Sequence, residues 1–289
     1  MQNLQKQNNM RFAFFGTPYV ARDTLAALSQ HGYTPECVVT SADAPSGRGM
    51  HLTPSPTKSW AQENNLPILT PEKLDEEFQA AIKSYDCEYA IVVAYGKIIP
   101  QVVIDMFPRG ILNIHYSLLP KYRGASPVES ALLHNETTTG VAIQRMVYQL
   151  DAGDILALKE VPILPNETTR ELRPRLIQIG AELLIETLPQ FENGTATYTP
   201  QDHSQATKCK KIQKEDGLLD IGGDAQNNWN KYRAYAESPG TYFFANKNGT
   251  QIRIKIKTAA FDGTSFTPLR VVPEGKKEMN YSDFAASLS

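Results

Sequence analysis

The stretch that decides the fold is ILNIHYSLLPKYRG, residues 111–124. In this stretch Ile111, Asn113 and His115 alternate with Leu112 and Ile114, which is the period-2 pattern of a strand. Because side chains two residues apart share a face of a strand, Asn113 and His115 are expected to project into one space. Pro120 has no N–H to give to a ladder, so we expect the strand to end at a turn before it.

An asparagine and a histidine side by side suit a catalytic task. Both side chains can donate a hydrogen bond to an oxygen that gains charge, and a histidine can also move a proton near neutral pH. The structural alternative is a half-buried strand whose Asn113 and His115 are bonded to backbone groups. The two residues alone leave both interpretations open.

The wider motif resembles a known family. NIHYSLLPKYRG resembles the N-x-H-x-SLLP-x-x-RG motif of the folate-dependent formyltransferases, in which a D-x-G segment follows a few dozen residues later. Here Asp151 begins such a segment, 36 positions after His115. The resemblance implies transfer of a formyl group from 10-formyltetrahydrofolate to an amine, without a metal. It also implies that Asn113 and His115 donate to the oxyanion, while Asp151 favours protonated His115 and orders a proton-moving water.

The segments before the motif predict an α/β fold with a Rossmann-like parallel sheet. Short apolar runs at 11–15, 36–40 and 89–94 are typical of buried parallel strands, and 20–31 predicts a helix. Gly16 stands alone after the first strand, so a dinucleotide site, which needs further glycines, is not expected.

Folate is expected beyond the carboxyl ends of these strands, where ligands bind in such sheets. Tyr95 and Gly96 follow the strand at 89–94, and the formyltransferases have a similar VVAYG-x-I-x-P segment. Gly96 could also simply make a turn. The residues expected to line the folate are Tyr95, Gly96, Ser117, Leu118, Leu119 and Pro120.

Residues 42–58 predict a long surface loop, because they contain three prolines and two glycines. They resemble the insertion P-x-GRG-x-x-L-x-PSP-x-K of methionyl-tRNA formyltransferases. The resemblance implies that this loop enters the acceptor arm of methionyl initiator tRNA. Arg48 and Lys58 are residues that phosphate contacts require. A merely solvated loop is the alternative.

The second half of the chain predicts a long helix at 168–191, with Pro174 marking a kink or an earlier start. Residues 251–258 alternate isoleucine with basic side chains, which predicts a strand with one basic face. The C-terminal region resembles a small oligonucleotide-binding (OB)-like β-barrel, shortened between 258 and 269. The further basic residues expected to contact tRNA are Lys208, Lys210, Lys211, Arg253 and Lys255, with a solvated surface as the alternative.

The 289 residues are expected to form two domains. We expect a leader at 1–9, a catalytic domain at 10–200, a linker at 201–214 and a tRNA-contacting domain at 215–289. Translation could begin at Met1 or at Met10. A hydrophobic content of 41% predicts a folded chain, and a net charge of −2 means that tRNA binding must rest on local patches.

The composition also bears on location and partners. Three cysteines lie far apart without a C-x-x-C pair, which argues against zinc and favours a reducing cytoplasm. No apolar run is long enough for a transmembrane helix, and a monomer is expected. The alternatives to methionyl-tRNA formylation are a sugar-amine formyltransferase, a shorter glycinamide ribonucleotide formyltransferase, and a non-catalytic tRNA- or folate-binding protein.

Overall fold

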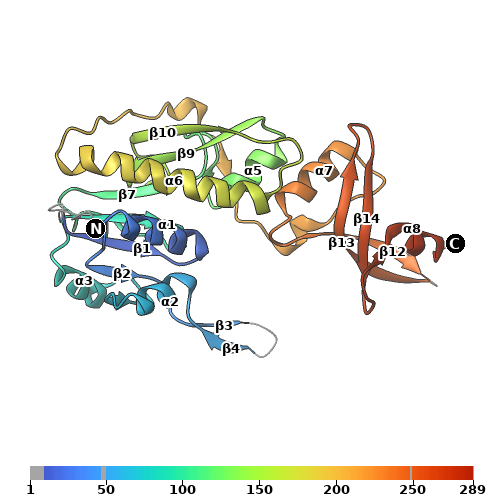
Figure 1. Cartoon of the computed structure of the whole chain (residues 1–289), viewed down its shortest axis with the longest axis horizontal. Coiled ribbons are helices and arrows are strands. Elements are labelled where there is room, and N and C mark those ends of the chain that lie inside the picture. The colour runs from blue at the N-terminus through green and yellow to red at the C-terminus, as the bar shows by residue number, and fades with distance from the viewer. Residues whose placement is uncertain (1–9, 47–49, 248, 289) are drawn as a thin grey trace, which may run out of the picture. The chain divides into compact units, whose positions relative to one another are not determined.

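A computed structural model describes residues 10–46, 50–247 and 249–288 of the chain (Figure 1). It divides into two compact units. The first contains the residues up to Arg123 together with 140–161 and 174–207, and the second contains 124–139, 162–173 and the residues from Lys208 onward. The predicted leader lies outside the described residues.

Among the described residues of the chain, seven strands form one sheet that is parallel over most of its width. The order across it is β10 (Ile155–Pro162), β9 (Thr138–Arg145), β7 (Ile111–His115), β6 (Tyr89–Val93), β1 (Phe12–Gly16), β2 (Cys37–Val39) and β5 (Ile68–Leu69). Neighbours from β7 to β5 are parallel, whereas β9 runs antiparallel to β7. The Rossmann-like α/β class expected from the sequence is therefore confirmed.

The sheet is buried on both faces, which explains why its strands read as continuous apolar runs. On one face, Ala13 and Phe15 of β1 pack in a cluster with Phe78 and Val103. The alternate residues turn to the other face, where the Phe12 ring stacks on Tyr89 and Tyr89 meets Phe191 edge to face.

Helices cover the two faces of this sheet. They are α1 (Tyr19–Gln30), α2 (Pro56–Glu63), α3 (Glu76–Lys83), α4 (Gln101–Ile104) and the long α6 (Thr169–Glu192). α6 begins before Pro174 and continues through it without a break, so the predicted long helix at 168–191 is confirmed. Near the start of a helix, a proline removes a single backbone hydrogen bond, and the remaining turns keep theirs. Gly180 lets α6 approach β7, because a methyl group there would meet Ile114 at 3.3 Å.

The predicted long loop at 42–58 is partly wrong, because it contains an antiparallel ribbon of β3 (Ala44–Ser46) and β4 (His51–Thr53). Both strands are edges, and edge strands tolerate proline, so Pro45 can lie opposite Leu52. α2 follows directly, with the Ser55 hydroxyl accepting a hydrogen bond from the Lys58 amide. Arg48 lies outside the described residues.

The second unit contains an antiparallel sheet, in which four strands are found among the described residues. They are β12 (Thr241–Lys247), β13 (Thr250–Phe261), β14 (Phe266–Pro273) and β15 (Met279–Asn280). The sheet is open, since no described residues of β12 and β15 pair, as expected for a shortened barrel. Ile254 and Ile256 are buried while Lys255 and Lys257 are exposed, so the predicted alternation is confirmed.

The described residues of the second unit include the helices α5 (Pro127–Leu133), α7 (Ala225–Ala234) and α8 (Tyr281–Ala286). Trp229 of α7 and Phe284 of α8 share a core with Phe243 and Ile254 of the sheet.

The segment at 201–214, expected to be a linker, carries short regular elements. They are the 3-10 turns η1 (His203–Gln205) and η2 (Lys214–Gly217), and the strand β11 (Lys208–Cys209), which pairs with β8 (Arg123–Gly124). Gly124 has a φ of +127°, and a methyl group there would overlap the Cys209 carbonyl oxygen. A glycine is therefore required at the end of the SLLPKYRG motif.

Candidate active site

The carboxyl ends of β6 and β7 lie next to each other, because these strands are parallel neighbours. Asn113 and His115 lie at the end of β7, with only 8% and 5% of each residue exposed. The Asn113 Nδ2 lies 3.4 Å from Oδ1 of Asp151, and the His115 Nδ1 lies 3.6 Å from Oδ2 of the same carboxylate. The three residues that the sequence pointed to therefore meet in one buried cluster.

The other ring nitrogen of His115 is engaged by the motif that follows the strand. Nε2 lies 2.9 Å from the backbone oxygen of Tyr122. A carbonyl oxygen can only accept, so Nε2 carries the hydrogen in this bond. Nδ1 is thus the ring nitrogen that faces Asp151 and remains for chemistry, and 3.6 Å is longer than a hydrogen bond between them.

Asp151 occupies a constrained turn. Its φ of +50° lies in the left-handed region, which side-chain-bearing residues rarely adopt. Gly153 presses against β9, because a methyl group there would overlap the Arg145 carbonyl oxygen. The Arg145 amide also donates to the Asp154 carbonyl at 2.9 Å. The D-x-G spacing therefore allows a tight turn that directs the Asp151 carboxylate toward the sheet.

Sequence reasoning missed Gln144, a residue of β9 that pairs with Asn113 in the ladder. Its Nε2 donates to the Asp151 Oδ1 at 2.9 Å, and only 1% of the residue is exposed. A polar residue directly after the apolar run of 141–143, in a segment predicted to be a strand, was the available signal.

Two more buried polar residues belong to this cluster: Gln201, which sequence reasoning missed, and Arg123, which lies in the quoted motif but was assigned no role. The Gln201 amide donates to the backbone oxygens of Asp151 and Gly153, and its oxygen accepts from Arg123. Nothing in the local sequence around Gln201 points to Asp151, which is 50 residues earlier.

Tyr95 and Gly96, which are predicted to bind folate, differ in which of their groups are accessible to a ligand. The Tyr95 ring packs edge to face on Phe15, and burial raises its pKa to about 12. Its hydroxyl has no hydrogen-bond partner among the described residues, and its backbone oxygen accepts from the Thr17 hydroxyl. Gly96 is exposed with a φ of +82°, so its backbone is the accessible group here.

In the SLLP turn, two of the four residues are buried. The Ser117 hydroxyl is buried and donates to the Lys121 carbonyl at 2.6 Å, and Leu119 is buried as well. Leu118 and Pro120 are partly exposed. A ligand at this turn would therefore meet Leu118 and Pro120 before the other two.

The predicted phosphate contacts also differ from one another. The Lys58 ammonium is 2.6 Å from Asp43, and the highly exposed Lys210 ammonium is 2.9 Å from Asp216. The Arg253 guanidinium lies 3.6 Å from the centre of the Tyr242 ring. The remaining three lysines are exposed and have no ion pair within the described part of the chain: Lys208, Lys211 and Lys255.

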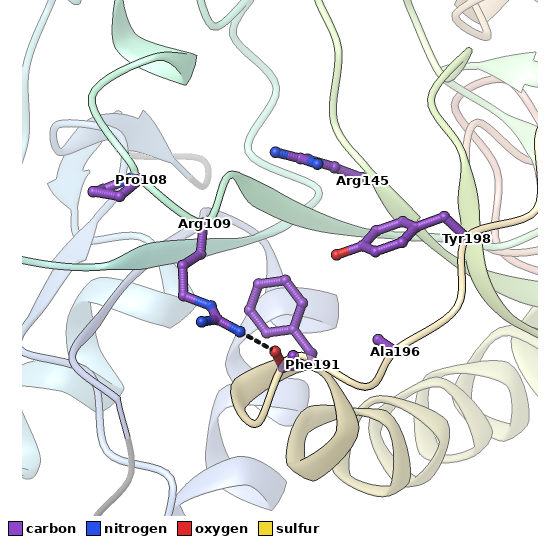
Figure 2. Close-up of a pocket in the computed structure, with 7 residues that line it drawn as sticks. Pro108, Arg109, Arg145, Phe191, Ala196 and Tyr198 are labelled. Atoms are coloured by element: carbon purple, nitrogen blue, oxygen red, sulfur yellow. Dashed lines mark hydrogen bonds between the residues drawn. The ribbon is translucent and has the colours of Figure 1, made fainter.

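A separate pocket of about 260 Å³ lies near the other end of β7. Figure 2 shows Arg109 and Arg145 at different sides of it, with the Phe191 ring between Arg109 and Tyr198. Arg109 donates to the Phe191 carbonyl at 2.5 Å, and Arg145 lies over the Tyr198 ring. None of the predicted site residues lines this pocket, so it is not the space around Asn113 and His115.

Two kinds of feature are absent from the described residues. No group of three or more His, Cys, Asp or Glu side chains there is arranged to hold a metal ion. Likewise, none of the helices in that part of the chain has the length and apolar character to cross a membrane.

Comparison with known proteins agrees with the geometry. A sequence model described as "Formyl transferase" matches residues 10–188. A methionyl-tRNA formyltransferase of Koribacter versatilis (strain Ellin345) is 39% identical over 295 residues, covering 95% of each chain. One from Thermus thermophilus is 41% identical, covering 92% of this chain and 86% of that protein.

A solved structure shows the same fold at low identity. The N-formyltransferase of Helicobacter canadensis, in complex with folinic acid and dTDP-3-aminofucose, has a TM-score of 0.63 and 19% identity. The match covers 88% of this chain and 90% of that one. With the family match and the relatives at about 40% identity, the chain belongs to the formyl transferase family, and within it to the methionyl-tRNA formyltransferases.

Proposed function

We propose that this chain transfers the formyl group of 10-formyltetrahydrofolate to the α-amine of methionyl initiator tRNA, giving N-formylmethionyl-tRNA for translation initiation. The observation that carries the proposal is the buried convergence of Asn113 and His115 on Asp151. Family membership and the names of the relatives support formyl transfer with methionyl-tRNA as the acceptor.

The reaction begins with attack of the neutral amine on the formyl carbon. A free α-amine has a pKa of about 8, so a useful neutral fraction exists near pH 7. The electrons of the carbonyl bond move to the formyl oxygen, where Asn113 donates the N–H that does not face Asp151. A preorganised donor of this kind contributes roughly 3 kcal/mol to stabilising the transition state.

Proton movement falls to His115 and Asp151. With Nε2 fixed on the Tyr122 carbonyl, Nδ1 is the nitrogen that accepts or donates a proton on the reacting side. Asp151 orders a water that carries the proton lost by the amine. The bond from the formyl carbon to N10 then breaks, and N10 takes up a proton, so that tetrahydrofolate leaves.

The donor and the acceptor occupy different surfaces in this proposal. Folate lies along the backbone of Tyr95 and Gly96 and against the SLLP turn at Ser117, Leu118, Leu119 and Pro120. The acceptor arm of the tRNA meets the segment at 42–58, which contains Arg48 and Lys58. The phosphates of the tRNA are neutralised by Lys208, Lys210, Lys211, Arg253 and Lys255.

We assign catalysis to a domain at 10–200 and tRNA contact to residues 215–289, joined through 201–214. The enzyme acts as a monomer in the cytoplasm, where translation takes place, and uses no metal.

The deciding experiment supplies 10-formyltetrahydrofolate with methionyl initiator tRNA, and in parallel with a nucleotide-linked amino sugar. We expect formylated methionyl-tRNA only, and we expect His115→Ala to lower kcat/KM by about 100-fold or more. The matched control is His31→Ala, because His31 is exposed and caps the end of α1.

Each other outcome contradicts part of the proposal. Formylation of the sugar alone would assign the chain to a different substrate class. Retention of most activity in His115→Ala, with an unchanged thermal unfolding midpoint, would overturn the mechanism.

A further inference from the structure

The side chain of Gln201 joins two parts of the chain that are far apart in sequence. Its Nε2 lies 3.0 Å from the backbone oxygen of Asp151 and 2.6 Å from that of Gly153. Only 6% of Gln201 is exposed. One amide group therefore satisfies two carbonyl oxygens of the turn that presents the Asp151 carboxylate.

The orientation of this amide is fixed by its partners. Its Oε1 accepts from the Arg123 Nε at 3.1 Å and Nη2 at 2.6 Å. A guanidinium only donates and carbonyl oxygens only accept, so a flipped amide would break all four contacts. Arg123 is itself buried, and its Nη2 lies 2.9 Å from the Nδ1 of His203.

The backbone conformation of the turn at Asp151 requires stabilising contacts from other parts of the chain. Its positive φ is costly for a residue with a side chain, and such conformations persist only where the surroundings over-determine them. The side chain of Asp151 is meanwhile oriented by Asn113 and Gln144. The backbone half of the residue is fixed by Gln201 and by the contact of Gly153 with β9.

We propose that Gln201, oriented by Arg123, is a positioning residue for formyl transfer: it holds the backbone of the Asp151 turn so that the carboxylate stays against His115. This inference rests on the proposed function. The side-chain hydrogen bonds of Gln201 go to the Asp151 turn and to Arg123, so it acts on the reaction through Asp151.

The first test is a pair of substitutions that keep the size of the side chain. Gln201→Glu keeps the acceptors for Arg123 but turns a carboxylate oxygen toward two carbonyl oxygens. Gln201→Leu removes both interactions. We expect kcat to fall by about 10-fold to 100-fold in each, as a small misplacement can cost that much, with KM for the folate donor within about 2-fold. Gln205→Leu is the matched control, because Gln205 is exposed and its side chain bonds to the neighbouring Ser204.

The second test separates positioning from a general loss of structure. In an Asp151→Ala background, Gln201→Leu should change kcat by less than about 2-fold, because the residue it positions is gone. An additive loss, equal to that in the wild-type background, would overturn the proposal.

The third test does not depend on activity, so it stands even if the proposed substrates are wrong. The side-chain ¹⁵N resonances of His115 report its surroundings by NMR. Gln201→Leu should shift them, Gln205→Leu should not, and the thermal unfolding midpoint shows that each variant is folded. Unshifted His115 resonances in a folded Gln201→Leu protein would show that the Asp151 turn keeps its position without Gln201, which would overturn the proposal. Absence of formyl transfer in the wild-type chain would instead refute the proposed function alone.

Discussion

Asp151 is the residue on which the site converges, because three side chains from two strands approach its carboxylate. Asn113 and His115 come from β7, and Gln144 comes from β9. The pairing of Gln144 with Asn113 across the ladder fixes these groups by strand register. A slip of one residue would turn all of them to the opposite face.

Gln144 is expected to orient the carboxylate through its amide. Gln144→Leu removes a hydrogen bond to a charged group, which is worth about 1.5–3 kcal/mol. We expect kcat to fall by about 10-fold or more. Gln144→Glu should be worse, because it places a second negative charge beside Asp151. Steady-state kinetics of both variants test this, and equal activity of Gln144→Glu and wild type would contradict it.

Gly153 is expected to tolerate no side chain. The methyl group of Gly153→Ala would overlap the Arg145 carbonyl oxygen, so the turn must move away from β9 and carry Asp151 with it. We expect lower kcat together with a lower thermal unfolding midpoint. Gly222→Ala is the control, because the nearest atom to its methyl group is 3.9 Å away. A fully active Gly153→Ala enzyme would show that the turn can accommodate a methyl group without displacing Asp151.

At the scale of elements, the sequence predicts the strands of the large sheet better than it predicts the structure of the segment at 42–58. β7 lies at the residues where the pattern predicts it, because its alternation reflects burial on a fixed register. The ribbon of β3 and β4 lies in a segment, 42–58, that has the composition of a loop, because it contains three prolines and two glycines. A two-stranded ribbon has no buried face to impose an apolar pattern, so its pairing leaves little trace in the sequence.

The junction between that ribbon and α2 is expected to depend on Ser55. Its hydroxyl accepts from the Lys58 amide and lies 2.8 Å from the Thr40 hydroxyl. Ser55→Ala should lower the free energy of unfolding by about 1 kcal/mol, as removal of an N-cap usually does. Ser59→Ala, inside the same helix, should change it far less. Urea denaturation measures both, and equal effects would mean that the cap is unimportant.

At the scale of the whole molecule, the net charge of −2 gives no general attraction to nucleic acid. Binding of tRNA must then depend on a small set of cations. Replacing the exposed Lys208, Lys211 and Lys255 with alanine should weaken binding in low salt. It should also reduce the slope of log K against log salt by roughly 0.7–0.9 for each lost contact.

Lys83→Ala, on the exposed surface of α3, is the control for that measurement. A triple variant with an unchanged salt slope would show that the phosphates are bound elsewhere.

Across the molecule, the sequence predicts what depends on short-range pattern and misses what depends on distant contacts. Asn113, His115 and Asp151 could be found, because they lie in motifs with a fixed spacing. Arg123 lies in the same motif, but its pairing with Gln201 could not be predicted, because it forms only when residues 78 positions apart meet. The same holds for the pairing of β11 with β8, which falls where a linker is predicted.

The place of Gln201 in the chain also limits where the protein can be cut. The match to the formyl transferase family stops at residue 188, a natural choice for ending an isolated fragment. Such a fragment keeps all seven strands of the large sheet, yet it lacks the amide that bonds to the backbone at Asp151 and Gly153. A fragment intended to retain chemistry should therefore extend at least to Thr207, whose backbone oxygen also accepts from Arg123.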